Sequence, residues 1–341
     1  MTTGAPARIA INGYGRIGQC VLRALYENGY RQHFQVVAIN ELADLATIAH
    51  LTRYDSTHGR FQGDVRTEGD ALVVNGDQVE VLRCADPADL PWDRLGVDLV
   101  LECSGSFSDR LTAEQHLVSG AKRLLFSQPA EPDVDRTVVY GVNDRDLTRE
   151  DRIVSAASCT TNCLVPVIKV LDDALGVEQG STTTIHAAMN DQPVIDAYHH
   201  QDLRRTRSAL HNIVPVETGL ARGIERLLPH LERRFNSVAM RVPTLNVSAI
   251  DMVLNVRETT SVEAVNAVLA NAASGPLNGI LGYTDELLAS ADFNHDARSG
   301  IVDGGQTRVT GGRMVKVLCW FDNEWGFANR MLDVSRRWLS L

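Results

Sequence analysis

The sequence predicts an α/β protein of two domains, the first built on a parallel sheet and the second an α+β domain with a mixed or antiparallel sheet. Three observations support this class. The chain has 341 residues, which is more than one typical domain. Residues 8–40 have the pattern of strand, amphipathic helix and strand, the βαβ unit of parallel sheets. From about residue 181 longer strand patterns follow one another, as in antiparallel sheets.

Composition and charge limit the classes of partner. Hydrophobic residues make up 44% of the chain and charged residues 22%, which is typical of a globular protein. The formal net charge of −10 argues against nucleic acid or an anionic membrane as the main partner. The first residues lack the pattern of a secretory signal, and no apolar run approaches the roughly 18 residues of a membrane span. We therefore expect a cytoplasmic protein.

A glycine-rich loop connects the first strand to the first helix. The strand at 8–12 is followed at once by Gly13, Gly15 and Gly18 in a G-x-G-x-x-G pattern, and the helix ends at Gly29. Glycines at these positions let the backbone approach a pyrophosphate, which the positive end of the helix attracts. Between a strand and a helix the pattern predicts a Rossmann dinucleotide-binding domain. A tight turn is the alternative reading.

Two later strands supply further residues for this site. The strand at 34–40 is followed by Glu41, close to the place where an acidic residue binds the adenosine ribose. Residues 97–105 have the pattern of a buried strand that ends in Ser104 and Gly105, at the edge where parallel sheets bind ligands. A plain strand-to-loop turn is again the alternative. We predict Glu41, Ser104 and Gly105 as cofactor contacts.

The stretch SAASCTTNCL at 155–164 contains two cysteines among small and hydroxylated residues. A disulfide framework is not expected in a cytosolic chain, where thiols stay reduced. The pattern C-x-x-x-C has neither a second cysteine pair nor nearby histidines, so we predict no metal site. A reactive thiol remains as the reading. The chain has six cysteines, at positions 20, 84, 103, 159, 163 and 319.

Of the two cysteines, Cys159 is better placed for reaction. A helix is expected from about 159 to 175, capped by Ser158 and bent at Pro166, and the positive end of a helix lowers the pKa of a thiol. Cys163 lies one turn further in and is expected to be a core residue. His186 closes the next strand and is a candidate base, although its spacing alone favours a structural histidine.

Several motifs together resemble the glyceraldehyde-3-phosphate dehydrogenase family, over residues from about 8 to 332: NGYGRIG, SAASCTTNC, TTTIHAAMNDQ, LRRTR, RVPT and DNEWGF. Other stretches are more similar to the erythrose-4-phosphate dehydrogenase branch of that family, namely NEL at 40–42, AAM at 187–189, VIDAYH, DFNHD and GFANRM. The resemblance implies NAD as cofactor, a sugar phosphate as substrate and a homotetramer. It also implies an NAD-binding domain at 1–158, completed by a C-terminal helix at 323–341, and a catalytic domain at 159–322.

The resemblance assigns roles to individual residues. It makes Cys159 the nucleophile and His186 its base, and it makes Asn323 the residue that holds the nicotinamide carboxamide. The contacts that it implies for the substrate phosphate or an attacking phosphate are Arg205, Thr218, Gly219 and Arg241. We further predict Arg16 and Ile17 as cofactor contacts, Ser158 and Thr160 as substrate contacts, and Arg204 and Arg207 as interface or solvent-exposed charges.

The sequence departs from the usual family pattern at three positions. Glu41 stands where the glyceraldehyde enzymes usually have Asp, but either carboxylate repels a 2′-phosphate, so NAD is expected in preference to NADP. Met189 replaces a threonine that binds the substrate phosphate, which removes a hydroxyl donor. Ala156 replaces an asparagine beside the cysteine, and no consequence is predicted for it.

The leading hypothesis is NAD-dependent oxidation of erythrose 4-phosphate to 4-phosphoerythronate, with water releasing the acyl group from the cysteine. The resemblance would place this reaction in pyridoxal phosphate (pyridoxine) synthesis. The nearest rival is a phosphorylating glyceraldehyde-3-phosphate dehydrogenase, which Met189 disfavours and the Thr218-Gly219 pair favours. A non-catalytic dinucleotide-binding protein on the same fold is a third reading, and the intact pair of Cys159 and His186 argues against it.

Overall fold

This computed structural model describes residues 5–199 and 202–341. The chain divides into two compact units, a first unit of residues 1–158 with 328–341 and a second unit of residues 159–327. The C-terminal segment of the first unit begins at Ala328 and not at residue 323, where it was expected. The reason is local, because the Trp325 ring in the first turn of the last helix stacks on His295 at a centroid distance of 3.7 Å, within the second unit.

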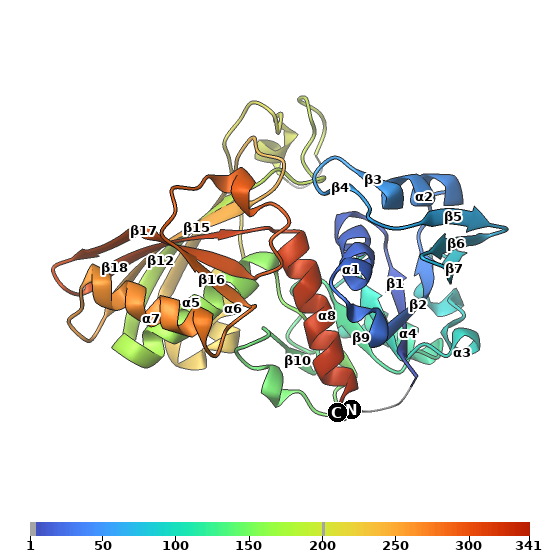
Figure 1. The fold of residues 1–341 in the computed structure, drawn as a ribbon, viewed down its shortest axis with the longest axis horizontal. Helices are drawn as coiled ribbons and strands as arrows, with labels where there is room; N and C mark the ends of the chain where they lie inside the picture. The colour runs from blue at the N-terminus through green and yellow to red at the C-terminus, as the bar shows by residue number, and fades with distance from the viewer. Residues whose placement is uncertain (1–4, 200–201) are drawn as a thin grey trace. The chain divides into compact units, whose positions relative to one another are not determined.

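The first unit contains a nine-stranded sheet with the order β10-β11-β9-β8-β1-β2-β7-β6-β5 (Figure 1). The pairs from β10 to β7 are parallel, whereas β6 and β5 are added antiparallel as an extension. This arrangement confirms the predicted α/β class with a Rossmann-type sheet. The strands are β1 (Ala7–Asn12), β2 (Phe34–Asn40), β5 (Val65–Glu68), β6 (Ala71–Val74), β7 (Asp77–Leu82), β8 (Leu99–Glu102), β9 (Leu124–Phe126), β10 (Arg136–Thr137) and β11 (Ile153–Ser155), with β3 (Tyr54–Asp55) and β4 (Gly59–Arg60) as a separate ribbon.

Helices connect these strands, and local chemistry sets their ends. They are α1 (Arg16–Glu27), α2 (Leu45–Arg53), α3 (Trp92–Leu95) and α4 (Arg110–Val118). The last helix, α8 (Trp325–Leu339), follows the second unit and belongs to the first from Ala328 onward. Asp44 and Asp109 cap α2 and α4 by accepting a hydrogen bond from a backbone N–H of the first turn. The β6–β7 hairpin turns at Asn75 and Gly76, both with positive φ, as the Asn-Gly pair predicts.

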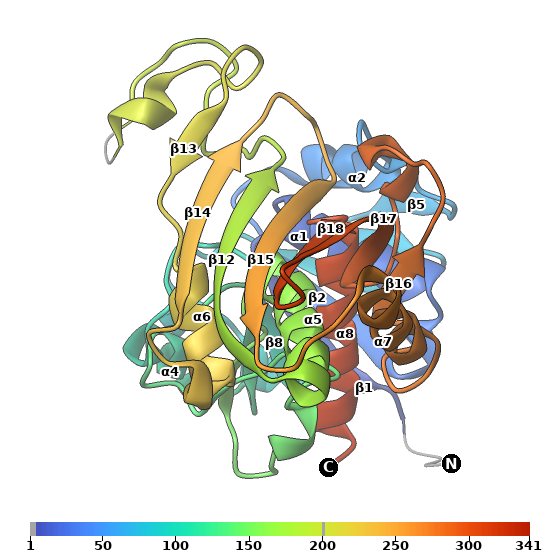
Figure 2. The same ribbon diagram turned by 90° about the vertical axis from the view of Figure 1, so that its left-hand side faces the viewer.

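The second unit contains a seven-stranded sheet with the order β13-β14-β12-β15-β18-β17-β16. Figure 2 shows β13, β14, β12 and β15 side by side. The β12–β14 and β16–β17 pairs are parallel and the other pairs are antiparallel, which is the mixed sheet predicted. The strands are β12 (Val177–His186), β13 (Val214–Val216), β14 (Phe235–Arg241), β15 (Ser248–Val256), β16 (Leu281–Thr284), β17 (Gly300–Thr310) and β18 (Met314–Phe321), and the helices are α5 (Cys159–Leu175), α6 (Leu220–Leu227) and α7 (Val262–Ser274).

Helix α5 has the predicted extent and continues through Pro166. Proline costs one backbone hydrogen bond, but its fixed φ is compatible with a helix. The residues from Thr161 to Ile168 are all buried, so packing on both sides of Pro166 holds the helix. The helix ends as predicted at Gly176, whose φ is 68°. Among the described residues, none of the helices combines the length and apolar character needed to cross a bilayer.

Candidate active site

Cys159 and His186 meet in the second unit. Cys159 is the first residue of α5, and His186 is the last residue of β12. The chain enters α5 through Ala157, whose φ of 60° is uncommon for a residue with a side chain. The Cys159 Sγ lies 3.8 Å from the His186 Nε2, and the Thr160 Oγ1 lies 3.9 Å from the same sulfur. The structure therefore brings the predicted nucleophile, base and neighbouring hydroxyl together.

The tautomer of His186 follows from its second nitrogen. Nδ1 lies 2.8 Å from the carbonyl oxygen of Ala187, and a carbonyl can only accept a hydrogen bond, so Nδ1 carries the proton. In the neutral ring the Nε2 lone pair then faces the Cys159 thiol. This is the geometry that a base for the thiol proton requires.

Desolvation sets the charge state of this pair. It raises the pKa of Cys159 to about 11, and hydrogen bonds from Thr160 and from the start of α5 offset only part of the rise. Desolvation also lowers the pKa of His186 below its usual value of 6.5, and the positive charge of Arg241 adds to this effect. The helix start lowers the thiol pKa as expected, but desolvation is larger and the net shift is upward. Both shifts favour a neutral thiol beside a neutral imidazole in the resting pair.

Ser248, which the sequence analysis did not identify, connects His186 to Asn323. Its Oγ accepts a hydrogen bond from the backbone N–H of Ala187 (3.0 Å) and donates to the Asn323 Oδ1 (2.8 Å). Since the carbonyl of Ala187 holds His186, one residue of β15 positions both side chains. The amide nitrogen of Asn323 keeps its two donors, which suits the carbonyl oxygen of a nicotinamide carboxamide. Ser248 lies in a stretch with an alternating strand pattern and no catalytic motif, so nothing in the sequence indicates its role.

Two of the predicted anion contacts, Arg205 and Arg241, share one carboxylate. Asp191 accepts two hydrogen bonds from the Arg241 guanidinium (2.5 and 3.0 Å) and one from Arg205 (2.9 Å). Burial alone would raise the pKa of Asp191, but the hydrogen bond from Arg241 and the charges of both arginines lower it, so the carboxylate is ionised at neutral pH. The Met189 sulfur lies 3.5 Å from the Arg241 Nη2. Asp191 was not predicted, although it lies in the AAMND stretch after His186.

Arg241 is close to the reacting pair by register. It ends β14 and pairs directly with His186 on the parallel strand β12. Its side chain is only 7% exposed, whereas the Asp191 side chain that it binds is 40% exposed, so solvent reaches the ion pair from the carboxylate side.

Thr218 and Gly219 belong to a different set of contacts from Asp191 and its two arginines. Thr218 lines a cavity of about 610 Å³ with Arg204 and Arg222, and its Oγ1 accepts from the backbone N–H of Leu220. Gly219 caps α6 without a side-chain hydrogen bond. Within the described part of the chain, no hydrogen bond connects either residue to Arg205 or Arg241. Of the arginines expected at an interface or in solvent, Arg207 pairs with Asp196 at 2.8 Å.

The glycine-rich loop of the first unit packs against the end of β8. A Cβ added to Gly13 would lie 2.4 Å from the backbone of Ser104, and φ at Gly13 is 88°. Two of the predicted cofactor segments therefore touch, and a side chain at position 13 would separate them. Gly105 also has a positive φ, of 69°.

The start of α1 has the features of a pyrophosphate site. Gly15 is the N-cap of α1 and provides no side-chain cap, and a Cβ built on it meets no atom within 4 Å. The open space and the first turn, with Arg16, Ile17 and Gly18, fit a bound phosphate. The guanidinium of Arg16 itself is bound to Asp55 (2.5 Å). We infer that Arg16 contributes through its place in this first turn.

Glu41 is held in place by the backbone. Its carboxylate accepts hydrogen bonds from the N–H groups of Tyr14 (2.9 Å) and Leu42 (2.8 Å). A carboxylate has about four acceptor sites, so capacity remains for the hydroxyls of a ribose. The first unit thus fits the groups of a dinucleotide at the carboxyl ends of β1, β2 and β8.

The sequence analysis did not predict a row of buried, hydrogen-bonded side chains at the carboxyl ends of β2, β1 and β8. Asn40 donates to Asn12 (2.7 Å), and Asn12 donates to Glu102 (2.5 Å). Glu102 also accepts from the backbone N–H of Ser104 at 2.8 Å, and its burial raises the pKa of its carboxyl group. Asn12, Asn40 and Glu102 directly precede Gly13, Glu41 and the 103–105 turn. This adjacency to predicted cofactor residues is the signal that could have found them.

Comparison with protein-family models gives two matches. Residues 7–110 match the NAD binding domain of glyceraldehyde 3-phosphate dehydrogenase, and residues 158–323 match its C-terminal domain. Together the two matches cover most of the chain. The chain belongs to the glyceraldehyde-3-phosphate dehydrogenase family.

Membership of the glyceraldehyde-3-phosphate dehydrogenase family makes this chain an NAD-dependent oxidoreductase that acts on a small sugar phosphate. NAD is the cofactor, in agreement with the sequence prediction and with the fit of the first unit. Bound NAD supplies the acceptor for a hydride from the substrate.

We predict opposite effects for alanine at two glycines of the cofactor loop. Gly13→Ala should lower the free energy of unfolding by about 1–3 kcal/mol, because its Cβ overlaps the Ser104 backbone at a strained φ. Gly15→Ala meets open space and should cost about 1 kcal/mol or less, yet weaken NAD binding about tenfold by obstructing the phosphate. Denaturant unfolding and NAD titration measure both. An unchanged NAD affinity in Gly15→Ala would remove this loop from the cofactor site.

We predict that His186→Asn retains NAD binding but lowers kcat by about 10²- to 10⁴-fold, the usual contribution of a general base. In the unmodified protein the acidic limb of the kcat/KM profile should lie below pH 6.5, since catalysis needs neutral His186 and desolvation lowers its pKa. Exposed His211 provides a matched control, and His211→Asn should leave kcat and the position of the acidic limb unchanged. A near-normal kcat in His186→Asn, or an acidic limb above pH 6.5, would return His186 to a structural role.

Proposed function

We propose that this member of the family oxidises erythrose 4-phosphate to 4-phosphoerythronate with NAD, and that water releases the acyl group. The observation that carries the proposal is the ionised carboxylate of Asp191 between Arg241 and Arg205. The branch-like stretches of the sequence, with Met189 beside Arg241, support the same substrate.

The chemistry begins with the resting thiol of Cys159. As the sulfur adds to the aldehyde carbon, the thiol proton passes to the Nε2 of His186 and from there to the new alkoxide, which gives a neutral hemithioacetal and a neutral imidazole. His186 then removes the hydroxyl proton while the carbon loses a hydride, and a thioester remains on Cys159. The proton on His186 leaves to solvent, so the ring is again a base for the second half of the reaction.

Hydrolysis of the thioester releases the acyl group and completes the reaction. With His186 neutral, Nε2 takes a proton from an attacking water, and the tetrahedral adduct expels the Cys159 sulfur, which recovers that proton. The sum is the conversion of aldehyde, NAD and water into carboxylic acid, NADH and one proton. Asn323 and Ser248 keep the nicotinamide carboxamide and the imidazole in fixed relation during these steps.

Asp191 favours water over inorganic phosphate as the acyl acceptor. A free phosphate needs unpaired guanidinium groups near the thioester, and Arg241 is the arginine beside His186 by strand register. Its Nη1 and Nη2 each donate one hydrogen bond to Asp191, as does the Nη1 of Arg205. A second anion would have to displace this carboxylate or lie against its negative charge. Water carries no charge and meets no such barrier.

In this proposal the substrate phosphate binds at a different position from the attacking water. Erythrose 4-phosphate carries its phosphate one carbon further from the aldehyde than glyceraldehyde 3-phosphate does. We assign its phosphate to Thr218 and Gly219 at the open start of α6, where Arg204 and Arg222 line the same cavity. The product would enter pyridoxal phosphate synthesis, and we place the reaction in the cytoplasm.

A phosphorylating glyceraldehyde-3-phosphate dehydrogenase is the second candidate. The same cavity beside Thr218 favours it, because that cavity could hold an attacking phosphate instead of the substrate phosphate. The two candidates differ in what they require of the buffer and in the product that they release.

We also propose that four copies of the chain associate. Large apolar side chains are exposed on one face of β12 and β14 and in the segment that follows β12, and a second copy would cover them: Ile185, Val238, Met240, Val194, Ile195, Leu203, Leu210 and Ile213. Sedimentation equilibrium tests this, and a monomer at working concentration would contradict it.

We predict that NADH forms from erythrose 4-phosphate in phosphate-free buffer and that the product is a free acid. Asp191→Ala should release Arg241 and Arg205 for inorganic phosphate, so phosphate should then stimulate turnover at least about tenfold and an acyl phosphate should appear. NADH absorbance and product analysis measure both.

The matched control for this experiment is Asp196→Ala, which breaks the exposed ion pair with Arg207 and should leave the reaction independent of phosphate. An absolute phosphate requirement in the unmodified protein, with an acyl phosphate product and faster turnover of glyceraldehyde 3-phosphate, would reject the proposal in favour of the second candidate.

A further inference from the structure

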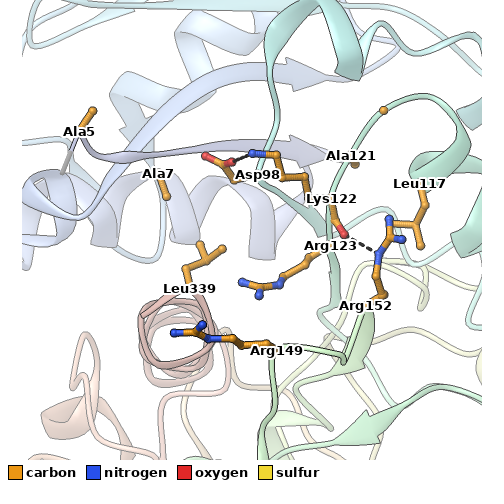
Figure 3. A pocket seen from close by; sticks show the side chains of 11 residues that line it. Ala5, Ala7, Asp98, Leu117, Ala121, Lys122, Arg123, Arg149, Arg152 and Leu339 are labelled. Carbon is orange, nitrogen blue, oxygen red and sulfur yellow. Dashed lines mark hydrogen bonds and ion pairs between the residues drawn. The ribbon is translucent and has the colours of Figure 1, made fainter. Parts of the chain in front are cut away.

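A cavity of about 740 Å³ lies in the first unit, lined by an unusual number of cationic side chains. Lys122, Arg123, Arg149 and Arg152 are among its lining residues, with Asp98 as the carboxylate and Leu339 at the end of α8. Figure 3 shows the guanidinium groups of Arg123 and Arg149 near Leu339, with Asp98 and Lys122 joined by an ion pair.

The cavity lies at the amino edge of the nine-stranded sheet. Ala7 begins β1, Asp98 directly precedes β8, Arg123 precedes β9 and Arg152 precedes β11, and these four strands are neighbours in the order β11-β9-β8-β1. The cofactor residues Gly13, Glu41 and Ser104 follow the carboxyl ends of strands in the same sheet. Because the strands are parallel, the two sets lie at opposite edges, and the cavity is separate from the dinucleotide site.

The positive charge in the cavity is not neutralised by the protein. Lys122 pairs with Asp98 at 2.7 Å. Among the described residues, none of the three arginines Arg123, Arg149 and Arg152 has a carboxylate partner. The lining thus carries four cations and one carboxylate, a local charge of about +3 by simple count. This contrasts with the net charge of −10 of the chain.

Packing fixes two of the arginines. The Arg123 guanidinium lies 5.3 Å from the centre of the Trp338 ring and donates to the Trp338 carbonyl at 3.3 Å. The Nε of Arg152 donates to the carbonyl of Lys122 at 2.9 Å, which leaves its terminal nitrogens as donors. Burial lowers the pKa of Arg123; the charges of Asp98 and Asp151 act against this shift, and repulsion from Arg149 and Arg152 adds to it. An anion in the cavity would relieve this repulsion.

We propose that this cavity binds a small molecule that carries two or more phosphoryl groups. A guanidinium group can bind two phosphate oxygens at once, and three of these groups spread around a cavity of this size suit more than one phosphoryl group. The volume lies within the range of small-ligand sites. Leu117, drawn beside Arg152 in Figure 3, and Leu339, drawn near Arg123 and Arg149, add apolar surface between the cationic groups.

Calorimetric titration with inorganic tripolyphosphate tests the proposal. The full chain is saturated with NAD first, so that the pyrophosphate position at α1 is filled. We expect one tripolyphosphate per chain, and Arg149→Ala and Arg152→Ala should each weaken its binding about tenfold or more. Arg149→Lys should retain part of the affinity. Arg149 is exposed and has no partner to lose, so its variants should unfold at the same temperature and form NADH at the same rate.

The matched control is Arg145→Ala, which removes an equal charge from an exposed position of the same segment outside the cavity and should change the affinity less than about twofold. Three results would overturn the proposal. They are failure of tripolyphosphate to bind, equal affinity in Arg149→Ala, Arg152→Ala and the unmodified chain, and equally tight binding of single inorganic phosphate. Tighter binding of a DNA oligonucleotide that these variants abolish would also overturn it, in favour of a macromolecular partner.

Discussion

Desolvation of Cys159 and His186 is the constraint on which the proposed chemistry depends. It disfavours both charged forms, since it raises the pKa of the thiol to about 11 and lowers that of the imidazole. The pair therefore rests neutral, with the Nε2 lone pair 3.8 Å from the sulfur. A proton can move between the two groups during addition, because the alkoxide that forms next to them accepts it.

The surrounding structure maintains this pair through backbone geometry. The left-handed turn at Ala157 sets the start of α5, and the carbonyl of Ala187 fixes the imidazole from β12. Ser248 accepts from the backbone N–H of the same residue, Ala187, and donates to Asn323. Residues of β15 and of the segments that follow β12 and β18 thus fix the imidazole and the Asn323 side chain relative to each other. In the first unit the row of Asn40, Asn12 and Glu102 does the same for the cofactor loops.

Local signals in the sequence were sufficient for the elements that depend on neighbouring residues. The glycine loop, the Asn75–Gly76 hairpin and the glycine end of α5 each follow from one residue type with one backbone preference. Sequence spacing also led to Cys159 and His186 as candidates, but the resemblance to a family was needed to prefer catalysis over structure. The extent of α5, with Pro166 inside it, was also predicted from its start at Cys159 and its end before Gly176.

The missed residues share a different property, since their partners are distant in sequence or lie in another strand. Asp191 becomes informative only when Arg241 and Arg205 converge on it. Ser248 depends on Ala187 and Asn323, and the cationic cavity collects residues from four separate loops and α8. The direction of the Cys159 pKa shift also needed the structure, because the helix start and desolvation act in opposite senses and only packing decides which is larger.

The most direct test of this account is an ultraviolet titration of the thiolate in the cofactor-free protein, taken as the difference between the unmodified chain and Cys159→Ser. The account predicts no Cys159 thiolate at neutral pH and ionisation only in the strongly alkaline range, near pH 11. A thiolate that ionises below pH 7 would contradict it, because Cys159 and His186 would then rest as an ion pair.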